Sequence, residues 1–299
     1  MPAITISHLT KRYGPVLAVD DLSFDVHPGK VTGFLGPNGS WKTTTLRILL
    51  GLAAPTSGSA TIGGLAYRQL PDPVRQVGAA LDSNTFHPGR TASQHLKVIA
   101  TATGLPHRRV AEVLDLVGLA SAAGRRVGGY SLGMRQRLSL AGALLGDPGV
   151  LVLDEPLNGL DPDGIRWIRG LLRALAAEGR TVLVSSHLLS EVAQTVDEVV
   201  VLSKGHVIAE TTLEELAGRG SVTRARTTDA TRLAGVLLAA GIQVHLVDGG
   251  TVEARGADAE AIGLAAAQAG LPILELSRQD EDLETLFFNL VHDRQEAAA

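Results

Sequence analysis

The feature that most constrains the fold is a glycine-rich segment between an apolar run and a helical pattern. Its sequence is Gly36-Pro-Asn-Gly-Ser-Trp-Lys-Thr-Thr44; it follows Val31–Leu35, and the helical pattern after it ends at Gly51. A strand, a glycine loop and a helix in this order nearly match the phosphate-binding pattern Gly, four residues, Gly-Lys-Ser/Thr. In such a loop, backbone N–H groups converge on phosphates and the helix N-terminus adds positive potential. Taken alone, the segment is equally compatible with a glycine-rich turn that binds nothing.

Two side chains of this segment suit phosphate chemistry, and one opposes it. We expect Lys42 to reach the outer phosphates and the Thr43 hydroxyl to ligate Mg²⁺. Trp41 stands where the pattern has its second glycine. Glycine is used there because the backbone passes close to phosphate, often in a conformation that costs a residue with a Cβ about 1–3 kcal/mol. The indole also adds bulk where a nucleotide would sit.

Acidic and imidazole side chains follow two further apolar runs. Asp154 and Glu155 come directly after Val150–Leu153, and His187 lies just past Thr181–Ser185. Such runs suit strands of a parallel sheet that is buried on both faces. At the ends of these strands, Asp154 can hold the Mg²⁺ shell, Glu155 can polarise an attacking water, and His187 can contact a γ-phosphate. The alternatives are a solvated turn for the acids and a capping or core role for the histidine.

A second helix start able to receive an anion is expected at Ser131. Serine is a favoured N-cap, Gly133 lies close to it, and the helical pattern Leu138–Leu145 follows. On its own, this is an ordinary capped helix. The order of the motifs gives it weight: glycine loop, capped helix, paired carboxylates, Asn158-Gly-Leu-Asp161 and histidine are five coincidences that chance would not arrange together.

Composition excludes several classes of site and partner. The 299 residues include no cysteine, which excludes a disulfide scaffold, a Cys-ligated zinc site, an iron–sulfur cluster and thiol catalysis. The net charge is -4 and no part of the chain has the basic face of a nucleic-acid binder, so we expect no nucleic-acid partner. No window approaches the roughly 18 apolar residues of a spanning helix, so a cytoplasmic chain is expected.

The alternation of strands and helices predicts an α/β core, with half-buried strands at Ala3–Ser7 and Leu22–Val26. Small residues at Ala217–Ser221 predict a linker, so domains are expected at residues 1–218 and 219–299. The second domain is expected to be a small α+β module. Its predicted helices are Thr231–Ala240, Ala257–Ala269 and a closing helix at Leu283–Val291, and its predicted strands are Val244–Val247, Thr251–Ala254 and Ile273–Leu276.

From about Ile4 to Glu215, these motifs resemble those of the ATP-binding subunits of ATP-binding cassette (ABC) transporters. The resemblance implies a fold of the α/β class: a P-loop NTPase core with an antiparallel β subdomain and a helical subdomain at about residues 90–147. It identifies Gly36–Thr44 as the Walker A loop, Ser131-Leu-Gly-Met-Arg-Gln136 as the signature motif, Leu151–Asp154 as Walker B and Asn158–Asp161 as the D-loop.

The resemblance also implies roles for single residues. Tyr13 falls where the family stacks an aromatic ring on adenine. The implied cofactors are ATP and Mg²⁺, the implied catalytic residues are Glu155, His187 and Lys42, and the implied metal ligands are Thr43, Asp82 and Asp154. The implied nucleotide-binding residues are Tyr13, Gly36, Pro37, Asn38, Gly39, Ser40, Trp41, Lys42, Thr43, Thr44, Ser131, Gly133, Gln136 and Asp161.

Three residues depart from the family's pattern. Leu132 replaces a signature glycine, as in some antibiotic exporters, and Asp82 stands where a glutamine would ligate Mg²⁺, which an aspartate oxygen can still do. Trp41 is the serious departure, because backbone strain of about 1–3 kcal/mol corresponds to roughly 5-fold to more than 100-fold weaker nucleotide binding. The site is either naturally degenerate or an altered copy of a competent ATPase. We favour the second, because the other catalytic positions are in place.

The function implied by the resemblance is an ATP-hydrolysing motor for export of a drug or other hydrophobic compound, impaired by Trp41. Two subunits, expected to form a homodimer, would hold ATP between the Walker A loop of one and the signature motif of the other. A separate transmembrane permease would form the pathway, with this chain on the inner face of the membrane. Two alternatives remain. A non-transport ABC ATPase usually has paired cassettes or a long coiled-coil insertion, which this chain lacks, and a non-hydrolysing regulatory subunit is favoured by Trp41.

Overall fold

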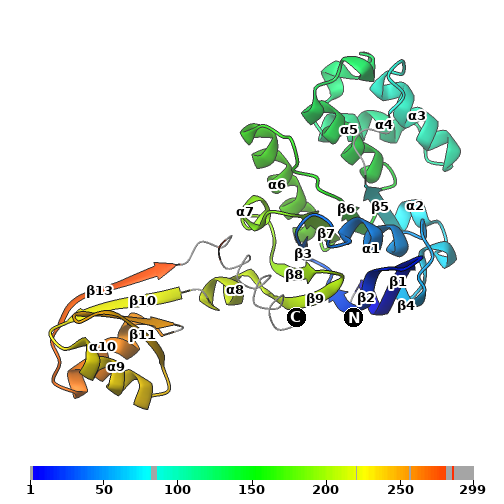
Figure 1. Ribbon diagram of the computed structural model, residues 1–299. Coiled ribbons are helices and arrows are strands. Elements are labelled where there is room, and N and C mark those ends of the chain that lie inside the picture. Colours follow the sequence, from blue (N-terminus) through cyan, green and yellow to red (C-terminus); the bar gives the residue numbers. More distant parts are fainter. Residues whose placement is uncertain (1–2, 82–85, 220, 256, 281–284, 286–299) are drawn as a thin grey trace. The chain divides into compact units, whose positions relative to one another are not determined.

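The computed structural model describes residues 3–81, 86–219, 221–255, 257–280 and 285 (Figure 1). The chain divides into two compact units, Met1–Glu210 and Thr211–Ala299. Each unit has its own cluster of buried apolar side chains. The division falls earlier than the boundary that the sequence predicted after residue 218.

The first unit is built around a six-stranded sheet in the order β5-β6-β7-β3-β8-β9. Adjacent strands from β5 to β8 pair in parallel. Every residue of β3, β6 and β7 is buried, as expected for apolar runs covered on both faces. The three predicted apolar strands are therefore confirmed. The strands are β3 (Val31–Leu35), β5 (Val77–Ala80), β6 (Val150–Leu153), β7 (Thr181–Ser186), β8 (Glu198–Ser203) and β9 (His206–Thr212).

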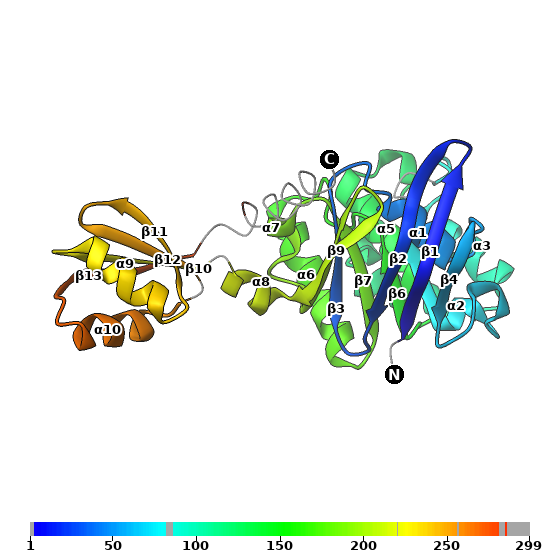
Figure 2. The same cartoon turned by 60° about the horizontal axis from the view of Figure 1, so that its bottom comes forward.

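A second sheet in this unit has three antiparallel strands in the order β2-β1-β4 (Figure 2). Its strands are β1 (Ile4–Tyr13), β2 (Val16–Val26) and β4 (Ser57–Ile62). The first two are longer than predicted because they form one hairpin that turns at Gly14, where φ is 56°. The pairing of β1 with β2 shifts register between Ile6 and Arg12. These irregularities interrupt the alternation of apolar and polar residues from which the strand ends were predicted.

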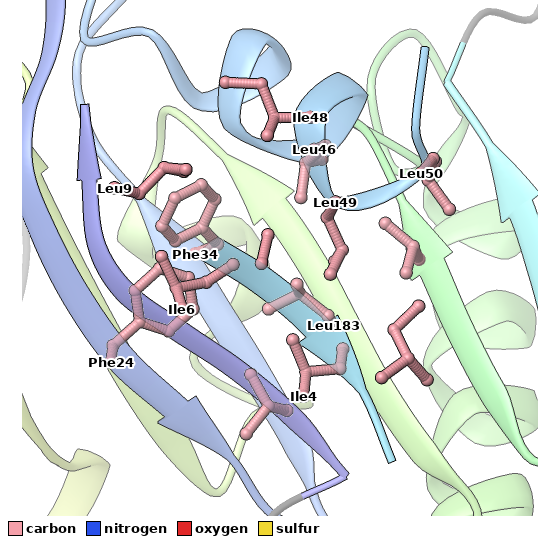
Figure 3. Close-up of a cluster of buried hydrophobic side chains, with 14 of the residues drawn as sticks. Ile4, Ile6, Leu9, Phe24, Phe34, Leu46, Ile48, Leu49, Leu50 and Leu183 are labelled. Carbon is pink, nitrogen blue, oxygen red and sulfur yellow. The ribbon is translucent and has the colours of Figure 1, made fainter. Parts of the chain in front are cut away.

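The core of the first unit lies where α1 (Lys42–Leu49) packs over the two sheets (Figure 3). Phe34 of β3 is fully buried and its ring stacks on that of Phe24 from β2, with centroids 5.1 Å apart. Leu46 and Leu49 of α1 belong to the same cluster. This packing fixes the end of β3 and the start of α1, and thereby both ends of the glycine loop.

The other α-helices in the described part of the first unit are α2 (Pro73–Gln76), α3 (Ala92–Ala102), α4 (Arg108–Leu116), α5 (Leu132–Leu144), α6 (Pro162–Ala177) and α7 (Leu189–Val192). Helices α3, α4 and α5 contact one another and gather on one side of this unit (Figure 1). The segment before α5 is held by the buried hydroxyl of Tyr130, which donates to the Ala122 carbonyl at 2.7 Å. This holds the chain in place ahead of the helix that begins after Ser131.

The second unit is an α+β module in which the helix α8 is followed by elements in the order β-α-β-β-α-β. Its elements are α8 (Leu213–Arg219), β10 (Ser221–Thr227), α9 (Ala230–Ala239), β11 (Gln243–Asp248), β12 (Thr251–Arg255), α10 (Ala259–Gln268) and β13 (Ile273–Asp280). The strands form an antiparallel sheet in the order β11-β12-β10-β13, which is the ferredoxin-like arrangement. The helices and strands predicted between Thr231 and Leu276 are confirmed within a few residues.

The linker predicted at Ala217–Ser221 is wrong. The helix α8 continues to Arg219, and β10 begins at Ser221. The sequence concealed β10 because its buried positions include the small or polar residues Thr223 and Ala225 in place of large apolar ones. The closing helix predicted at Leu283–Val291 lies, apart from Thr285, outside the described residues.

Candidate functional site

The phosphate-binding pattern forms a loop between the end of β3 and the first turn of α1. Gly36 must be glycine, because an added Cβ would lie 2.5 Å from Ser40 Oγ and 2.7 Å from the Leu202 carbonyl oxygen. Asn38 and Gly39 are exposed at the tip of the loop, and Gly39 has a φ of 83°. The helix has no side-chain cap and no acidic residue in its first turn. Its first N–H groups can therefore serve an anion.

Lys42 is buried beneath this loop, with 7% of its surface exposed. Its Nζ donates to the Gly36 carbonyl at 2.6 Å, lies 3.5 Å from the Pro37 carbonyl and lies 3.6 Å from Glu155 Oε1. Burial lowers the pKa of the Lys42 ammonium below its usual value, and the carboxylates of Glu155 and Asp154 partly counteract this. The structure thus brings Lys42 next to the paired acids that the sequence placed after a separate strand.

Asp154 is held between two hydroxyl groups, one from the helix α1 and one from the strand β7. Its Oδ2 accepts a hydrogen bond from Thr43 Oγ1 at 2.7 Å, and its Oδ1 accepts one from the Ser185 hydroxyl. Mg²⁺ at nucleotide sites is bound by one or two carboxylates together with hydroxyl, water and phosphate oxygens. Thr43 and Asp154 supply oxygen donors of this kind at adjacent positions, so they fit Mg²⁺. Among the described residues, no cluster of three or more His, Cys, Asp or Glu forms an all-protein metal site.

Glu155 lies at the meeting point of the remaining predicted catalytic groups. His187 Nδ1 is 2.9 Å from Glu155 Oε2, so the imidazole and the carboxylate share a hydrogen bond. Glu155 also has a φ of 49°, in the left-handed region. Its N–H donates to Ser185 Oγ at 2.9 Å, and its carbonyl accepts from Gln136 Nε2 at 3.1 Å. The backbone is therefore held on both sides of a strained residue.

Residues of the predicted signature motif and D-loop line a separate hollow. Ser131 is the N-cap of α5 and its Oγ accepts the Met134 N–H at 3.2 Å, as the sequence predicted. Asp161 caps α6 in the same way, accepting the Gly164 N–H at 2.8 Å. Together with Gly133, they line a hollow of about 590 Å³. None of the described residues lining it belongs to the glycine loop, so one chain does not bring the two anion-receptive helix starts together.

Comparison with known proteins decides the family. The model of the ABC transporter family matches residues 19–158. The bacitracin transport ATP-binding protein BcrA of Bacillus licheniformis is 43% identical over 220 residues, which cover 72% of each chain. The chain belongs to the ATP-binding subunits of ABC transporters. Such subunits are ATPases coupled to transport.

Other relatives of this ABC subunit agree. The lantibiotic transport ATP-binding protein SrtF of Streptococcus pyogenes is 35% identical over 207 residues, covering 69% of this chain and 90% of the relative. A solved structure described as the ATP binding subunit of an ABC transporter matches with a TM-score of 0.65 and 28% identity, over 72% of this chain and 91% of that one. Residues 221–284 of the ABC subunit match a domain of unknown function, DUF8746.

The indole of Trp41 turns toward Tyr13 in this ABC subunit. The two rings are stacked with centroids 6.4 Å apart and an angle of 30° between their planes, and Lys11 Nζ lies 4.8 Å from the Tyr13 centroid. Trp41 is half-buried against the apolar core and has a φ of 72°. Trp41 therefore has a left-handed backbone, and its indole packs beside the residue implied to stack on adenine.

Among the other predicted residues, Thr44 is half-buried in α1, and Ser40 is buried with no hydrogen-bond partner for its Oγ within the described structure. Asp82 lies outside the described residues. Sequence reasoning missed Ser185, which contacts both acids. The sequence feature that could have identified Ser185 is its hydroxyl near the end of an apolar strand, two residues before His187. No helix in the described part of the ABC subunit has the length and apolarity needed to cross a membrane.

Proposed function

We propose that this chain is the ATP-hydrolysing motor subunit of an exporter for peptide antibiotics or other hydrophobic compounds. The observation that carries the proposal is the convergence of Lys42 from the start of α1, Glu155 from the segment after β6 and His187 from the segment after β7, with Glu155 within 3.6 Å of each of the other two. The names of the relatives, which include bacitracin and lantibiotic transport proteins, support the class of cargo.

The geometry supports a division of labour in hydrolysis. Glu155, whose carboxylate is oriented by His187, accepts a hydrogen bond from the attacking water. This directs the lone pair of the water toward the γ-phosphate. Lys42 leaves the Gly36 carbonyl and balances charge on the outer phosphates. Because His187 Nδ1 is bonded to Glu155, its Nε2 is the atom left to contact the γ-phosphate. Thr43 and Asp154 would hold Mg²⁺, which would neutralise phosphate charge.

The proposed motor works with a second copy of the chain and with a membrane permease. The hollow formed by Ser131, Gly133 and Asp161 lies apart from the glycine loop, so a second copy facing head to tail would complete the site. A separate membrane permease would dock beside α3 and α5. There an apolar groove of about 460 Å³ is lined by residues that include Leu81, Phe86, Ile99 and Leu138. In this arrangement, the chain works on the cytoplasmic face of the membrane.

Trp41 impairs this motor in the proposal. A nucleobase that stacks on Tyr13 must compete with the indole that already lies against that ring. The backbone strain that the sequence suggested belongs to the fold itself, because Trp41 has a left-handed φ of 72° there. Strain therefore lowers the stability of the folded chain, and the bulk of the indole opposes nucleotide binding.

Phosphate release from Mg-ATP tests the proposal in three full-length proteins: the chain itself, Trp41→Gly, and Trp41→Gly combined with Glu155→Gln. We expect slow release by the first, faster release by the second and none above background by the third. Nucleotide binding by Trp41→Gly with no turnover would overturn the motor assignment and favour a non-hydrolysing regulatory subunit. Equal rates for the chain and Trp41→Gly would refute the impairment by Trp41.

A further inference from the structure

We propose that the Ser185 hydroxyl positions both acids of the site, Asp154 and Glu155, and so sets metal affinity and the rate of hydrolysis. The inference rests on the proposed function and assigns a role to a residue outside the motifs. Ser185 is fully buried near the end of β7, the strand between β6 and β3 in the sheet. It is thus placed between the strand that ends in the acids and the strand that ends in the glycine loop.

One hydroxyl makes two different contacts. A serine hydroxyl has one proton to donate and two lone pairs to accept with. The proton of Ser185 goes to Asp154 Oδ1, and a lone pair accepts the Glu155 N–H at 2.9 Å. The sheet register explains the reach, because Leu153 pairs with Val184 and the next residue along each strand brings Asp154 beside Ser185.

For Asp154, the contact fixes the carboxylate from the side away from Thr43. Thr43 donates to Oδ2 at 2.7 Å and Ser185 donates to Oδ1, so each oxygen has a hydroxyl partner. Hydrogen bonds to a ligating carboxylate orient it, and their loss typically costs about 10- to 100-fold in metal affinity or activity. When Thr43 turns to Mg²⁺, Ser185 is the hydroxyl that continues to hold Asp154.

For Glu155, the contact stabilises an unfavourable backbone. A non-glycine residue with a φ of 49° persists only where its surroundings hold it. Here the Glu155 N–H is bound by Ser185 and its carbonyl by Gln136, at 2.9 and 3.1 Å. In this conformation, the carboxylate reaches His187 and Lys42. Removal of the Ser185 hydroxyl frees the N–H and lets the carboxylate leave its place between them.

The adjacent serine shows that burial in this strand does not by itself create such contacts. Ser186 is also buried, at 2% exposure, but its hydroxyl bonds to the Leu188 carbonyl at 3.0 Å and to Glu191 at 3.2 Å. These contacts hold the turn after His187, and neither acid is among them. Ser186→Ala is therefore a matched control that removes a buried hydroxyl from the same strand end.

Metal binding is the measurement that distinguishes a role of Ser185 in positioning the acids from a role in fold stability alone. Two full-length parent proteins are used, the unchanged chain and its Trp41→Gly variant. Each is saturated with ADP, and Mn²⁺ binding is measured by electron paramagnetic resonance. We expect Ser185→Ala to weaken Mn²⁺ binding by about 10- to 100-fold, and nucleotide affinity in EDTA to change by less than about twofold. Ser185→Thr keeps the hydroxyl and should restore Mn²⁺ binding, and Ser186→Ala should leave it unchanged.

Ser185→Cys provides a second loss variant of nearly the same volume whose thiol is only a weak donor and acceptor. It should behave like Ser185→Ala, and it keeps the test open if the alanine variant fails to fold. Mn²⁺ binding at parental strength in the folded alanine or cysteine variant overturns the inference alone. Absence of nucleotide-dependent Mn²⁺ binding already in the Trp41→Gly parent overturns the proposed function and this inference with it.

Discussion

Replacing Trp41 tests how the indole acts on the nucleotide site. The indole stacks on Tyr13 at 6.4 Å and packs against the core, and its residue already has the left-handed φ of 72° and ψ of 23°. Two substitutions separate the possible causes. Trp41→Ala removes the indole and keeps a Cβ at the strained position, and Trp41→Gly removes both. Because the left-handed conformation is part of the fold itself, we expect the indole to account for the proposed loss of affinity.

The magnitude follows from the ring contact. An aromatic pair is worth about 0.5–1.5 kcal/mol beyond its buried area, and a base that takes the Tyr13 face must displace that contact. At about 1.4 kcal/mol per tenfold, ATP should bind about 2- to 12-fold more tightly to either variant. Direct overlap between indole and nucleotide would increase the gain. The two variants should differ in stability, because relief of the left-handed strain in Trp41→Gly is worth about 1–2 kcal/mol.

Equilibrium titration with a fluorescent ATP analogue and Mg²⁺ measures this gain, and Trp167→Phe is the control. Trp167 is the other tryptophan of the chain, and its ring lies 4.2 Å from the Arg137 guanidinium in contact between α6 and α5. Its loss should leave nucleotide affinity unchanged. The reasoning is refuted if Trp41→Ala and Trp41→Gly bind ATP no more tightly than the parent. A gain with glycine but not alanine would show that the backbone is the cause.

Three further outcomes are expected. Glu155→Gln in the Trp41→Gly protein should lower turnover by about 10²- to 10⁴-fold and keep ATP affinity, measured by phosphate release and titration; loss of binding instead would argue against a role as the base. Thr43→Val should raise the Mg²⁺ concentration needed for half-maximal phosphate release, because it removes the hydroxyl that is expected to ligate Mg²⁺ and that donates to Asp154 at 2.7 Å; an unchanged Mg²⁺ midpoint would count against metal ligation. Gly58→Ala should destabilise the fold by more than about 2 kcal/mol in urea unfolding, because its φ is 76° and its Cβ would lie 2.0 Å from the His8 carbonyl oxygen. Gly63→Ala, also at positive φ but facing open space, should cost only about 1 kcal/mol, and equal losses would refute the steric argument.

Local patterns predicted the strands and helix starts that carry the site. Val31–Leu35 and Val150–Leu153 are the observed bounds of β3 and β6, because continuous apolar runs of this length fit a sheet covered on both faces. Ser131 is the observed cap of α5, because its hydroxyl bonds to an N–H only three residues ahead. Such features depend on neighbours in sequence, and sequence reasoning reaches them.

Contacts between segments that are distant in the sequence were harder to predict. The sequence placed Lys42, Glu155 and His187 in order but could not show that Ser185 contacts both Asp154 and Glu155, which depends on the register of β6 and β7. It also could not show that the Trp41 indole turns to Tyr13, 28 positions earlier in the chain. In the second unit, the strand β10 was missed because its pattern is polar.

Specific ATPase activity as a function of protein concentration tests the central claim most directly. The claim is that ATP is hydrolysed at a site shared by two copies of this chain, since Ser131 and Asp161 lie apart from the glycine loop in one copy. For the Trp41→Gly protein at saturating Mg-ATP, the rate per chain should rise with concentration toward a plateau. A rate per chain that is the same at every concentration, or no hydrolysis at any of them, would contradict the account.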